Sequence, residues 1–355
     1  MKSTSDILIV KPSSLGDIFH TFPAVALLRK HHPNAQIDWL VNPEFADAID
    51  FCPAKIRRKI IFPRRELARF PKFCGAFLRL TRQLRAERYQ MVIDFQGLFR
   101  SAFFGWLCKT KHQIGFANPK EFSAKLFYHR IFIPESSVDH AIERNLSLAR
   151  QLLDNNDTPA MPELSLMPVP RFTDAVNQRF SNLKINADDL LIAVTPGARW
   201  ESKCWPPEFF ASVIAKTAQV AKEAKFLILG SDAERLAAQQ VMEQVPGVKI
   251  ISLAGETSIG ELIEIIRRCQ VLISNDSGPI HIAAAAQVPV FAFFGPTDPD
   301  LTGPYGTDNQ VFQAEVECLK CFERKCPGKG SICQSLNAEE VSDSLINHLK
   351  NKDLL

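Results

Sequence analysis

The sequence has no apolar run long enough to cross a membrane. Its longest nearly apolar stretch, residues 282–294, is interrupted by Gln287 and Pro289 and falls short of the roughly 20 residues that a transmembrane helix needs. Only four apolar residues in a row precede Lys11, which is too few for the apolar core of a signal peptide. We therefore expect a cytoplasmic protein that is not integral to a membrane.

Two glycine-rich signatures are also missing. The loop after the first predicted strand, residues 11–18, contains a single glycine and matches neither the dinucleotide-binding pattern nor the P-loop. Neither kind of cofactor site is supported, and we expect that the chemistry of this protein requires no cofactor.

Neither sign of charge is in large excess over the whole chain, since the net charge is only +3. Seven cations nevertheless fall within sixteen residues: Arg57, Arg58, Lys59, Arg64, Arg65, Arg69 and Lys72. Such a cluster suits a phosphorylated or carboxylated partner, an anionic membrane face or nucleic acid, and a solvated helix face is the alternative. Nucleic acid is the weakest option and we expect none, because the cluster lacks the interleaved exposed aromatic side chains of a single-strand platform.

The chain is long enough for two cores, and 46% hydrophobic with 23% charged residues is ordinary for a globular enzyme. Short apolar runs alternate with longer amphipathic stretches; the runs are residues 7–10, 37–41, 59–62 and 91–95, then 190–195, 226–229, 248–252, 271–274 and 288–294. This alternation predicts α/β architecture with parallel sheets covered by helices. We expect two tandem Rossmann-like, doubly wound domains that face a cleft.

The polar, proline-rich segment 155–170 is typical of a linker. The first domain is therefore expected to span residues 1–160 and the second residues 171–336. The remaining residues, 337–355, have helical spacing, with Asn337 as the cap. We expect this helix to pack back on the first domain.

The first candidate site is the strand-loop-helix corner at residues 11–18. Small residues there allow a ligand to approach the backbone, and the start of a helix favours an anion or holds a carboxylate. Asp17 is therefore either a helix-capping acid or a catalytic base that faces the cleft.

The second candidate site follows the first strand of the second half. Arg199 and Lys203 are expected in an exposed loop, where Lys203 is either a surface lysine or a clamp for a diphosphate. Glu234, which follows the strand at 226–229, either accepts hydrogen bonds from a ribose or lies in the first turn of a helix.

The third candidate site, residues 274–281, is again a strand followed by a helix. Asp276 and Ser277 are able to cap this helix, and Gly278 leaves N–H groups accessible to a phosphate. His281 either donates to that phosphate or is a satisfied core histidine.

A cysteine cluster forms the fourth candidate site, with four of the nine cysteines at positions 318, 321, 326 and 333. In a reducing compartment, Cys318, Cys321, Cys326 and Cys333 favour a structural metal site over disulfides. The spacing is not that of a standard zinc finger, so a redox pair and free thiols remain alternatives.

Taken together, these motifs resemble the bacterial lipopolysaccharide heptosyltransferases of glycosyltransferase family 9. The likeness runs nearly end to end and rests on SSLGDIFHTFPAVALLRKHHP at 13–33, VIDFQGLFRSA at 92–102, KEFSAKLFY at 120–128, HAIERN at 140–145, SKCWP at 202–206, NDSGPIHIAAA at 275–285 and FGPTDPDLTGPYG at 294–306. The QGL, EFSAKLFY and HAIERN segments look most like heptosyltransferase I.

The resemblance implies a GT-B fold and an inverting transfer of heptose from ADP-heptose to the Kdo sugar of Kdo-lipid A. It implies that Asp17 is the general base, which would displace the capping interpretation. On the donor side it implies that Lys203, Ser277, Gly278 and His281 hold the diphosphate, Asp276 the heptose hydroxyls and Glu234 the ribose.

The same resemblance assigns acceptor binding to Ser14, Gly16, Arg64, Arg65 and Lys120. The family often has Arg at the last position, and lysine lacks the bidentate geometry with which arginine meets a carboxylate. The resemblance also implies peripheral contact with the anionic cytoplasmic face of the inner membrane. Heptosyltransferase II or III, another family 9 transferase, and a non-catalytic nucleotide-sugar-binding protein are the alternatives.

Overall fold

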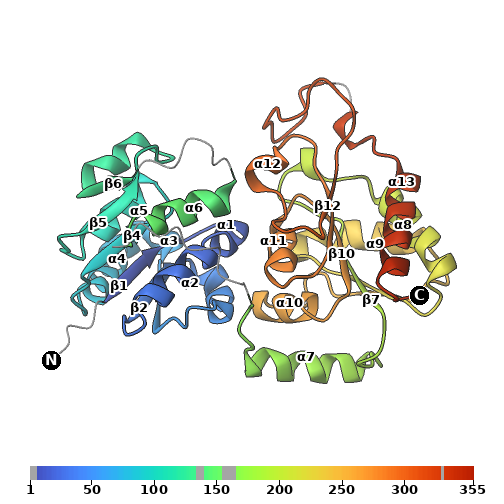
Figure 1. Cartoon of the computed structure of the whole chain (residues 1–355), viewed down its shortest axis with the longest axis horizontal. Coiled ribbons are helices and arrows are strands. Elements are labelled where there is room, and N and C mark those ends of the chain that lie inside the picture. The colour runs from blue at the N-terminus through green and yellow to red at the C-terminus, as the bar shows by residue number, and fades with distance from the viewer. Residues whose placement is uncertain (1–5, 133–139, 154–164, 329–331) are drawn as a thin grey trace. The chain divides into compact units, whose positions relative to one another are not determined.

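The computed structural model describes residues 6–132, 140–153, 165–328 and 332–355 (Figure 1). Contacts between residues divide the chain into two compact units, Met1–Pro168 (unit 1) and Val169–Leu355 (unit 2). The division falls inside the proline-rich segment at 155–170. Residues 154–164, which include the first part of the predicted linker, lie outside the described residues.

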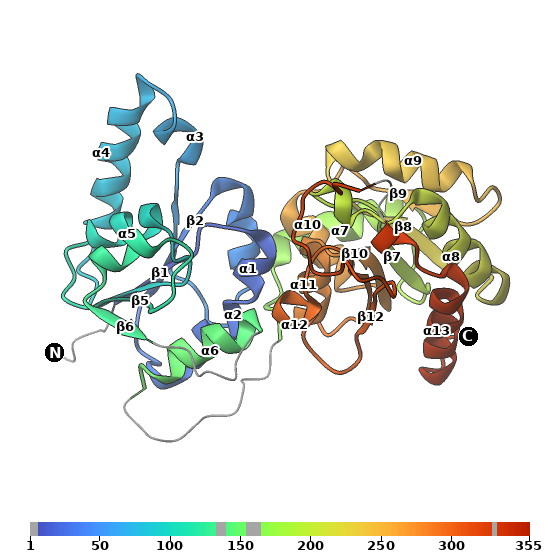
Figure 2. The same ribbon diagram turned by 90° about the horizontal axis from the view of Figure 1, so that it is seen from above.

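Unit 1 is a parallel sheet with helices on both faces. Its six strands are β1 (Ile7–Val10), β2 (Ile37–Val41), β3 (Arg58–Ile61), β4 (Met91–Asp94), β5 (Gln113–Phe116) and β6 (Arg130–Phe132), in the order β3-β2-β1-β4-β5-β6. Its helices are α1 (Leu15–Phe19), α2 (Phe22–His31), η1 (Pro43–Phe51), α3 (Arg64–Leu67), α4 (Lys72–Leu84), α5 (Phe99–Trp106), η2 (Phe122–Phe127) and α6 (Ala141–Arg150). Figure 2 shows α4 and α5 over one face and α2 and α6 over the other.

Unit 2 repeats this architecture. Its six strands are β7 (Leu191–Thr195), β8 (Lys225–Ile228), β9 (Ile250–Ser252), β10 (Val271–Asn275), β11 (Val290–Phe293) and β12 (Gln310–Phe312), in the order β12-β11-β10-β7-β8-β9. Its helices are α7 (Pro170–Asn182), η3 (Glu201–Lys203), α8 (Pro207–Val220), η4 (Asp232–Glu234), α9 (Arg235–Glu243), α10 (Ile259–Ile266), α11 (Gly278–Ala285), α12 (Pro299–Thr302), η5 (Ile332–Gln334) and α13 (Ala338–Asn351).

The two doubly wound, Rossmann-like domains predicted from the strand-helix alternation are confirmed. Strands β1, β2, β7 and β10 are buried along their whole length, as expected for parallel strands that are covered on both faces. The sequence pattern misses β5, β6 and β12, because β6 and β12 have only three residues and the four of β5 include Gln113 and Gly115, so none is a continuous apolar run.

Each sheet has one point at which the strand order reverses. In unit 1 this switch point lies between β1 and β4, and in unit 2 between β7 and β10. The chain leaves the two strands toward opposite faces there, which opens a crevice at their carboxyl ends where ligands of doubly wound sheets bind. Three of the four candidate motifs follow β1, β7 and β10, and they therefore lie at these two switch points.

The C-terminal helix does not behave as expected. Val341, Leu345 and Leu349 of α13 are buried in the same core cluster as Phe210 and Ile214 of α8. The prediction that residues 337–355 pack on the first domain is therefore wrong, because the apolar stripe of α13 completes the core of unit 2. Asn337 caps the helix as predicted, since its side chain accepts a hydrogen bond from the backbone N–H of Glu339.

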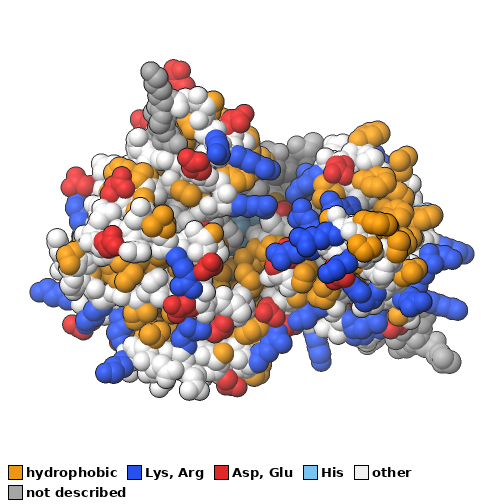
Figure 3. Space-filling view, turned by 180° about the vertical axis from the view of Figure 1, so that it is seen from behind, with side chains coloured by type: hydrophobic (Ala, Val, Ile, Leu, Met, Phe, Trp, Pro, Cys, Tyr) orange, Lys and Arg blue, Asp and Glu red, His pale blue; other side chains and the backbone are white. Residues whose placement is uncertain are grey.

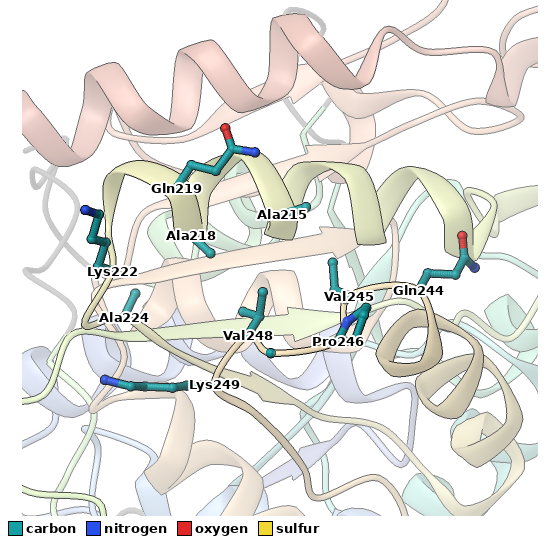
Figure 4. A pocket seen from close by; sticks show the side chains of 11 residues that line it. Ala215, Ala218, Gln219, Lys222, Ala224, Gln244, Val245, Pro246, Val248 and Lys249 are labelled. Carbon is teal, nitrogen blue, oxygen red and sulfur yellow. The ribbon is translucent and has the colours of Figure 1, made fainter.

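The pocket in Figure 4 lies beside strands β8 and β9 of unit 2. It is lined by the end of α8 and by the segments that lead into β8 and β9, with Lys222 and Lys249 among the lining residues. It therefore adjoins the amino ends of these strands, away from the loops that carry the candidate residues.

Across the described ranges, no helix is both long and apolar enough to cross a bilayer.

We expect Leu345→Ala to destabilise unit 2 by about 2–5 kcal/mol, because it leaves a cavity in a close-packed core. Hydrogen exchange measured by mass spectrometry should show faster exchange in α8 peptides of this variant. Asn347→Ala, on the exposed side of the same helix, is the matched control and should leave exchange unchanged. Protection of α8 that survives Leu345→Ala would contradict the packing described here.

Candidate active site

Asp17 lies in the first turn of α1, and its two carboxylate oxygens have different surroundings. Oδ2 accepts hydrogen bonds from the backbone N–H of Ser14 at 3.0 Å and from its hydroxyl at 2.9 Å. These bonds form part of a capping box, so the capping interpretation of Asp17 is confirmed. Oδ1 lies 3.5 Å from Nζ of Lys11 and 3.7 Å from Nζ of Lys120, which leaves this oxygen facing two cations.

The electrostatic surroundings hold Asp17 in its ionised form. Burial alone would raise the pKa of this carboxyl, but the charges of Lys11 and Lys120 and the N–H of Ser14 lower it well below its usual range. The side chain is 29% exposed, so water reaches it. An ionised carboxylate that is open to a ligand is able to accept a proton, and capping does not prevent this role.

Lys11 contributes to this site although the sequence analysis did not select it. It is buried, and its ammonium group donates to the carbonyl of Phe95 at 3.0 Å. Burial lowers the pKa of Lys11, an effect that the neighbouring Asp17 opposes. A lysine directly after a buried strand was the available signal, but it is equally typical of a solvated loop.

The loop after β4 braces the same corner. Oε1 of Gln96 accepts a hydrogen bond from the backbone N–H of Ser13 at 3.3 Å. Gly97 has a φ of +69°, and a Cβ at this position would lie 3.1 Å from the backbone nitrogen of Lys120, closer than a side chain is normally tolerated. The QGL motif therefore connects the loop of Asp17 to the segment that carries Lys120.

The cations of the cluster at residues 57–72 fall into two groups. Arg57 and Arg58 pair with the buried carboxylate of Asp38 at 2.7 Å, and Lys59 pairs with Asp50 at the same distance. These three are structural, so they do not belong to an open anion site.

Arg64 and Arg65 are different, because both are exposed on the short helix α3. This helix follows β3, which β2 separates from β1 in the sheet. The structure thus brings Ser14, Gly16, Asp17 and Lys120 together around α1, but it places Arg64 and Arg65 two strands away.

In unit 2 the predicted clamp Lys203 is paired with another predicted residue. Its Nζ lies 2.5 Å from Oδ2 of Asp276, the hydroxyl of Thr297 donates to the same oxygen, and the ring of Trp200 lies 4.6 Å from Nζ. The side chain of Lys203 is only 16% exposed. The expectation of an exposed lysine is therefore wrong for Lys203, although Arg199 is exposed.

Asn275 explains how the loop of Lys203 is positioned. This fully buried side chain accepts a hydrogen bond from the backbone N–H of Trp205 at 2.9 Å and donates to the carbonyl of Pro196 at 2.7 Å. It thereby ties the loop after β7 to the end of β10. The sequence analysis placed Asn275 in a motif without assigning it this role.

The start of α11 carries the other predicted phosphate-binding residues. Ser277 is the N-cap and Gly278 the first helical residue, and Pro279 follows. His281 is 9% exposed on the buried side of the helix, and its contact with a phosphate stays a prediction. The N–H groups at this helix start lie beside β10, next to Asp276.

Glu234 lies at the rim formed by the loops after β7 and β8. It belongs to a capping box with Ser231, whose backbone N–H donates to its carboxylate. A Cβ at Gly197 would lie 2.4 Å from Cγ of Glu234, so a larger residue there would displace the Glu234 side chain. The prediction of a helix-start position for Glu234 is confirmed, and a ribose contact stays a prediction.

The cysteine-rich segment packs against the loop of Lys203. The hydroxyl of Ser202 donates to the carbonyl of Glu323 at 2.6 Å, and the amide of Gln334 donates to the carbonyls of Glu201 and Ser202 at 3.1 Å. Cys333 lines a small pocket together with Lys203. The segment therefore supports the predicted diphosphate site, a role that the sequence analysis missed.

The four cysteines of the predicted metal site form no disulfide. Cys318 and Cys321 are exposed, Cys326 is half-buried and Cys333 is buried. Burial and the other three thiols raise the pKa of Cys333, yet among the described residues no group of three or more His, Cys, Asp or Glu is placed to hold a metal ion. A structural metal at Cys318, Cys321, Cys326 and Cys333 stays a prediction.

Comparison with known proteins places this arrangement in context. The model of the family "Glycosyltransferase family 9 (heptosyltransferase)" matches residues 77–331. Lipopolysaccharide heptosyltransferase 1 of Escherichia coli K12 is 30% identical over 88% of this chain and 95% of its own length. The same enzyme of Pseudomonas aeruginosa is 28% identical over 90% and 87%, and lipooligosaccharide heptosyltransferase 2 of Haemophilus influenzae is 25% identical over 93% and 94%.

Solved structures share the fold. A family 9 glycosyl transferase from Veillonella parvula superposes with a TM-score of 0.84 at 22% identity, and each chain covers 99% of the other. The E. coli heptosyltransferase WaaC with ADP has a TM-score of 0.76 at 24% identity, with 97% of this chain and 99% of that chain covered.

We expect Lys120→Met to raise the pKa of the Asp17 carboxyl toward its usual value, because one of the two cations that favour its ionised form is lost. Carboxyl ¹³C NMR titration would measure the shift. A lowered native pKa stabilises the fold above the pKa of the unfolded carboxyl, and this stability is lost as the pH falls. The variant should therefore lose less stability than the wild type on acidification. Lys125→Met removes the same charge five residues away and should leave Asp17 unchanged; equal shifts in both variants would refute the contact.

Proposed function

The chain belongs to glycosyltransferase family 9, the heptosyltransferase family, and on that premise we propose that it transfers L-glycero-D-manno-heptose from ADP-heptose to the Kdo sugar of Kdo-lipid A. It is a glycosyltransferase, and its relatives are named for lipopolysaccharide and lipooligosaccharide. The observation that carries the proposal is the position of the Asp17 carboxylate, at the switch point of unit 1 with one oxygen directed at two lysines.

The donor half of the proposal rests on unit 2. Departure of ADP places negative charge on the diphosphate, and Lys203 with the N–H groups at the start of α11 would stabilise that charge. In the free protein Asp276 neutralises Lys203 at 2.5 Å. A bound diphosphate would take over part of the contact with Lys203, so the Asp276 carboxylate would become available to accept hydrogen bonds from the heptose hydroxyls. Glu234 would meet the ribose at the rim.

The acid–base step uses Asp17. The acceptor hydroxyl oxygen forms a bond to the anomeric carbon of the heptose while its proton passes to the Asp17 carboxylate. The bond between that carbon and the phosphate oxygen breaks, and ADP leaves with the electron pair, so the anomeric configuration is inverted. Positive charge that develops on the sugar ring is stabilised by the same carboxylate.

The low pKa of Asp17 has a consequence for this step, because a carboxylate held by two cations is a weak base. An acceptor carboxylate or phosphate that pairs with Lys120 would offset part of that positive charge. Acceptor binding would then raise the pKa of Asp17 and strengthen it as a base at the moment when the hydroxyl arrives. Kdo carries a carboxylate, which suits this arrangement.

The choice of acceptor rests on segments of unit 1. In HAIERN, the ring of His140 caps α6 by accepting from the N–H of Ile142, and the buried amide of Asn145 donates to the carbonyl of His20 at 3.0 Å. This segment thus supports the turn that follows α1 and Asp17. Heptosyltransferase II is the second candidate, because relatives of that name are 25–26% identical over most of the chain.

A transfer assay with ADP-heptose tests the acceptor. We expect ADP release and a mass increase of one heptose with Kdo-lipid A as acceptor, and no transfer to a lipid A that lacks Kdo. Transfer only to an acceptor that already carries heptose would replace this assignment with heptosyltransferase II or III.

Two variants should separate chemistry from donor binding. Asp17→Asn keeps an oxygen that can cap α1 but cannot accept the proton, so we expect turnover to fall by at least about a hundredfold, with ADP affinity unchanged in calorimetry. Lys203→Met should instead weaken ADP binding. Each variant is the control for the other, and near-normal turnover of Asp17→Asn or unchanged ADP affinity of Lys203→Met would remove that residue from its role.

A further inference from the structure

The cysteine-rich segment, residues 316–328 and 332–334, is held to unit 2 mainly by polar contacts. Most residues between 317 and 328 are exposed, and the cysteines form no disulfide. Figure 3 shows this end of unit 2, at the upper left, with Asp and Glu beside Lys and Arg on the surface. Because the segment has little apolar interior, its conformation depends on the loops that it contacts.

The first of these loops follows β7. The hydroxyl of Ser202 donates to the carbonyl of Glu323 at 2.6 Å, and its backbone N–H donates to the carbonyl of Arg324 at 3.4 Å. The side-chain amide of Gln334 donates to the carbonyls of Glu201 and Ser202, both at 3.1 Å. The segment therefore binds the hydroxyl, the N–H and the carbonyl of the same loop residue.

The second loop follows β11. The backbone N–H of Lys320 donates to the carbonyl of Gly295 at 3.3 Å, and the N–H of Phe322 donates to the carbonyl of Pro296 at 2.7 Å. Nζ of Lys320 also lies 2.7 Å from Oδ1 of Asp298, the N-cap of α12. One segment thus ties the loop after β7 to the loop after β11.

These two loops supply the partners of one carboxylate. Lys203 comes from the loop after β7 and Thr297 from the loop after β11, and both contact Oδ2 of Asp276. The ring of Trp200 lies 4.6 Å from Nζ of Lys203 and 5.5 Å from the guanidinium carbon of Arg324. The segment therefore reaches the surroundings of Lys203 through the backbone and through this ring.

We propose that Gln334 is a positioning residue for the nucleotide-sugar donor, because its amide fixes the two carbonyls that directly precede Lys203. The inference rests on the proposed function, in which Lys203 binds the diphosphate. Lysine carries its charge on a flexible stem, and ordering a loop and a long side chain opposes binding. A loop that is already held by Gln334 needs less ordering when the donor binds.

Calorimetry with ADP tests this role in the full chain. Gln334→Met keeps the length of the side chain but removes both N–H donors, so we expect the Kd for ADP to rise by about three- to tenfold. Gln219→Met, on the exposed side of α8, is the matched control and should leave the Kd unchanged. Thermal unfolding of the same samples verifies that both variants are folded at the temperature of the titration.

A double-mutant cycle separates positioning of Lys203 from a merely structural role. If Gln334 acts through Lys203, the variant that combines Gln334→Met with Lys203→Met should bind ADP no more weakly than Lys203→Met alone. Losses of affinity that add fully would overturn the inference.

The remaining outcomes distinguish this inference from the proposed function. Wild-type ADP affinity in Gln334→Met, together with weakened binding in Lys203→Met, would overturn the inference and leave the donor site standing. A wild-type protein that binds no ADP, or an unchanged affinity in Lys203→Met, would overturn the proposed donor role of Lys203 and this inference with it.

Discussion

The pairing of parallel strands at the two switch points is the constraint on which the candidate site depends. A parallel pair requires a crossover, and the crossovers of each unit run to opposite sides of β1 and β4 or of β7 and β10. Residues far apart in the chain therefore meet at one sheet edge. Lys11 reaches the carbonyl of Phe95, and Asn275 reaches Pro196 and the loop of Lys203.

Charge at these edges is balanced within the protein before any ligand arrives. Asp17 is held between Lys11 and Lys120, and Lys203 is held by Asp276. Buried or half-buried charges need such partners because their desolvation is costly. Under the proposed function, substrates that carry carboxylate and phosphate groups exchange with these internal partners, so binding of each substrate also changes the electrostatics of the residue that acts on it.

Structural roles and the proposed functional roles also coincide in the same side chains. One oxygen of Asp17 caps α1 while the other faces the two lysines. The cysteine-rich segment, which the sequence suggests as a metal site, accepts a hydrogen bond from the hydroxyl of Ser202 and lines a pocket with Lys203. A substitution in either place has two physical effects, which is why isosteric changes such as Asp to Asn separate them better than truncation to alanine.

The sequence by itself determined the fold class, because alternating apolar runs and amphipathic stretches specify parallel strands with helical crossovers. It also determined which loops carry the candidate residues and which family the chain resembles. Tertiary structure alone decided the partners: that Arg57 and Arg58 neutralise a buried Asp38, that Lys203 is paired and not exposed, and that α13 completes the core of unit 2. It also decided that rings of α4, α5 and η2 contact one another through Phe77, Phe103 and Phe127. The physical reason is that periodicity is a local property of the chain, whereas ion pairs and shared surfaces depend on distances between residues that only folding brings together.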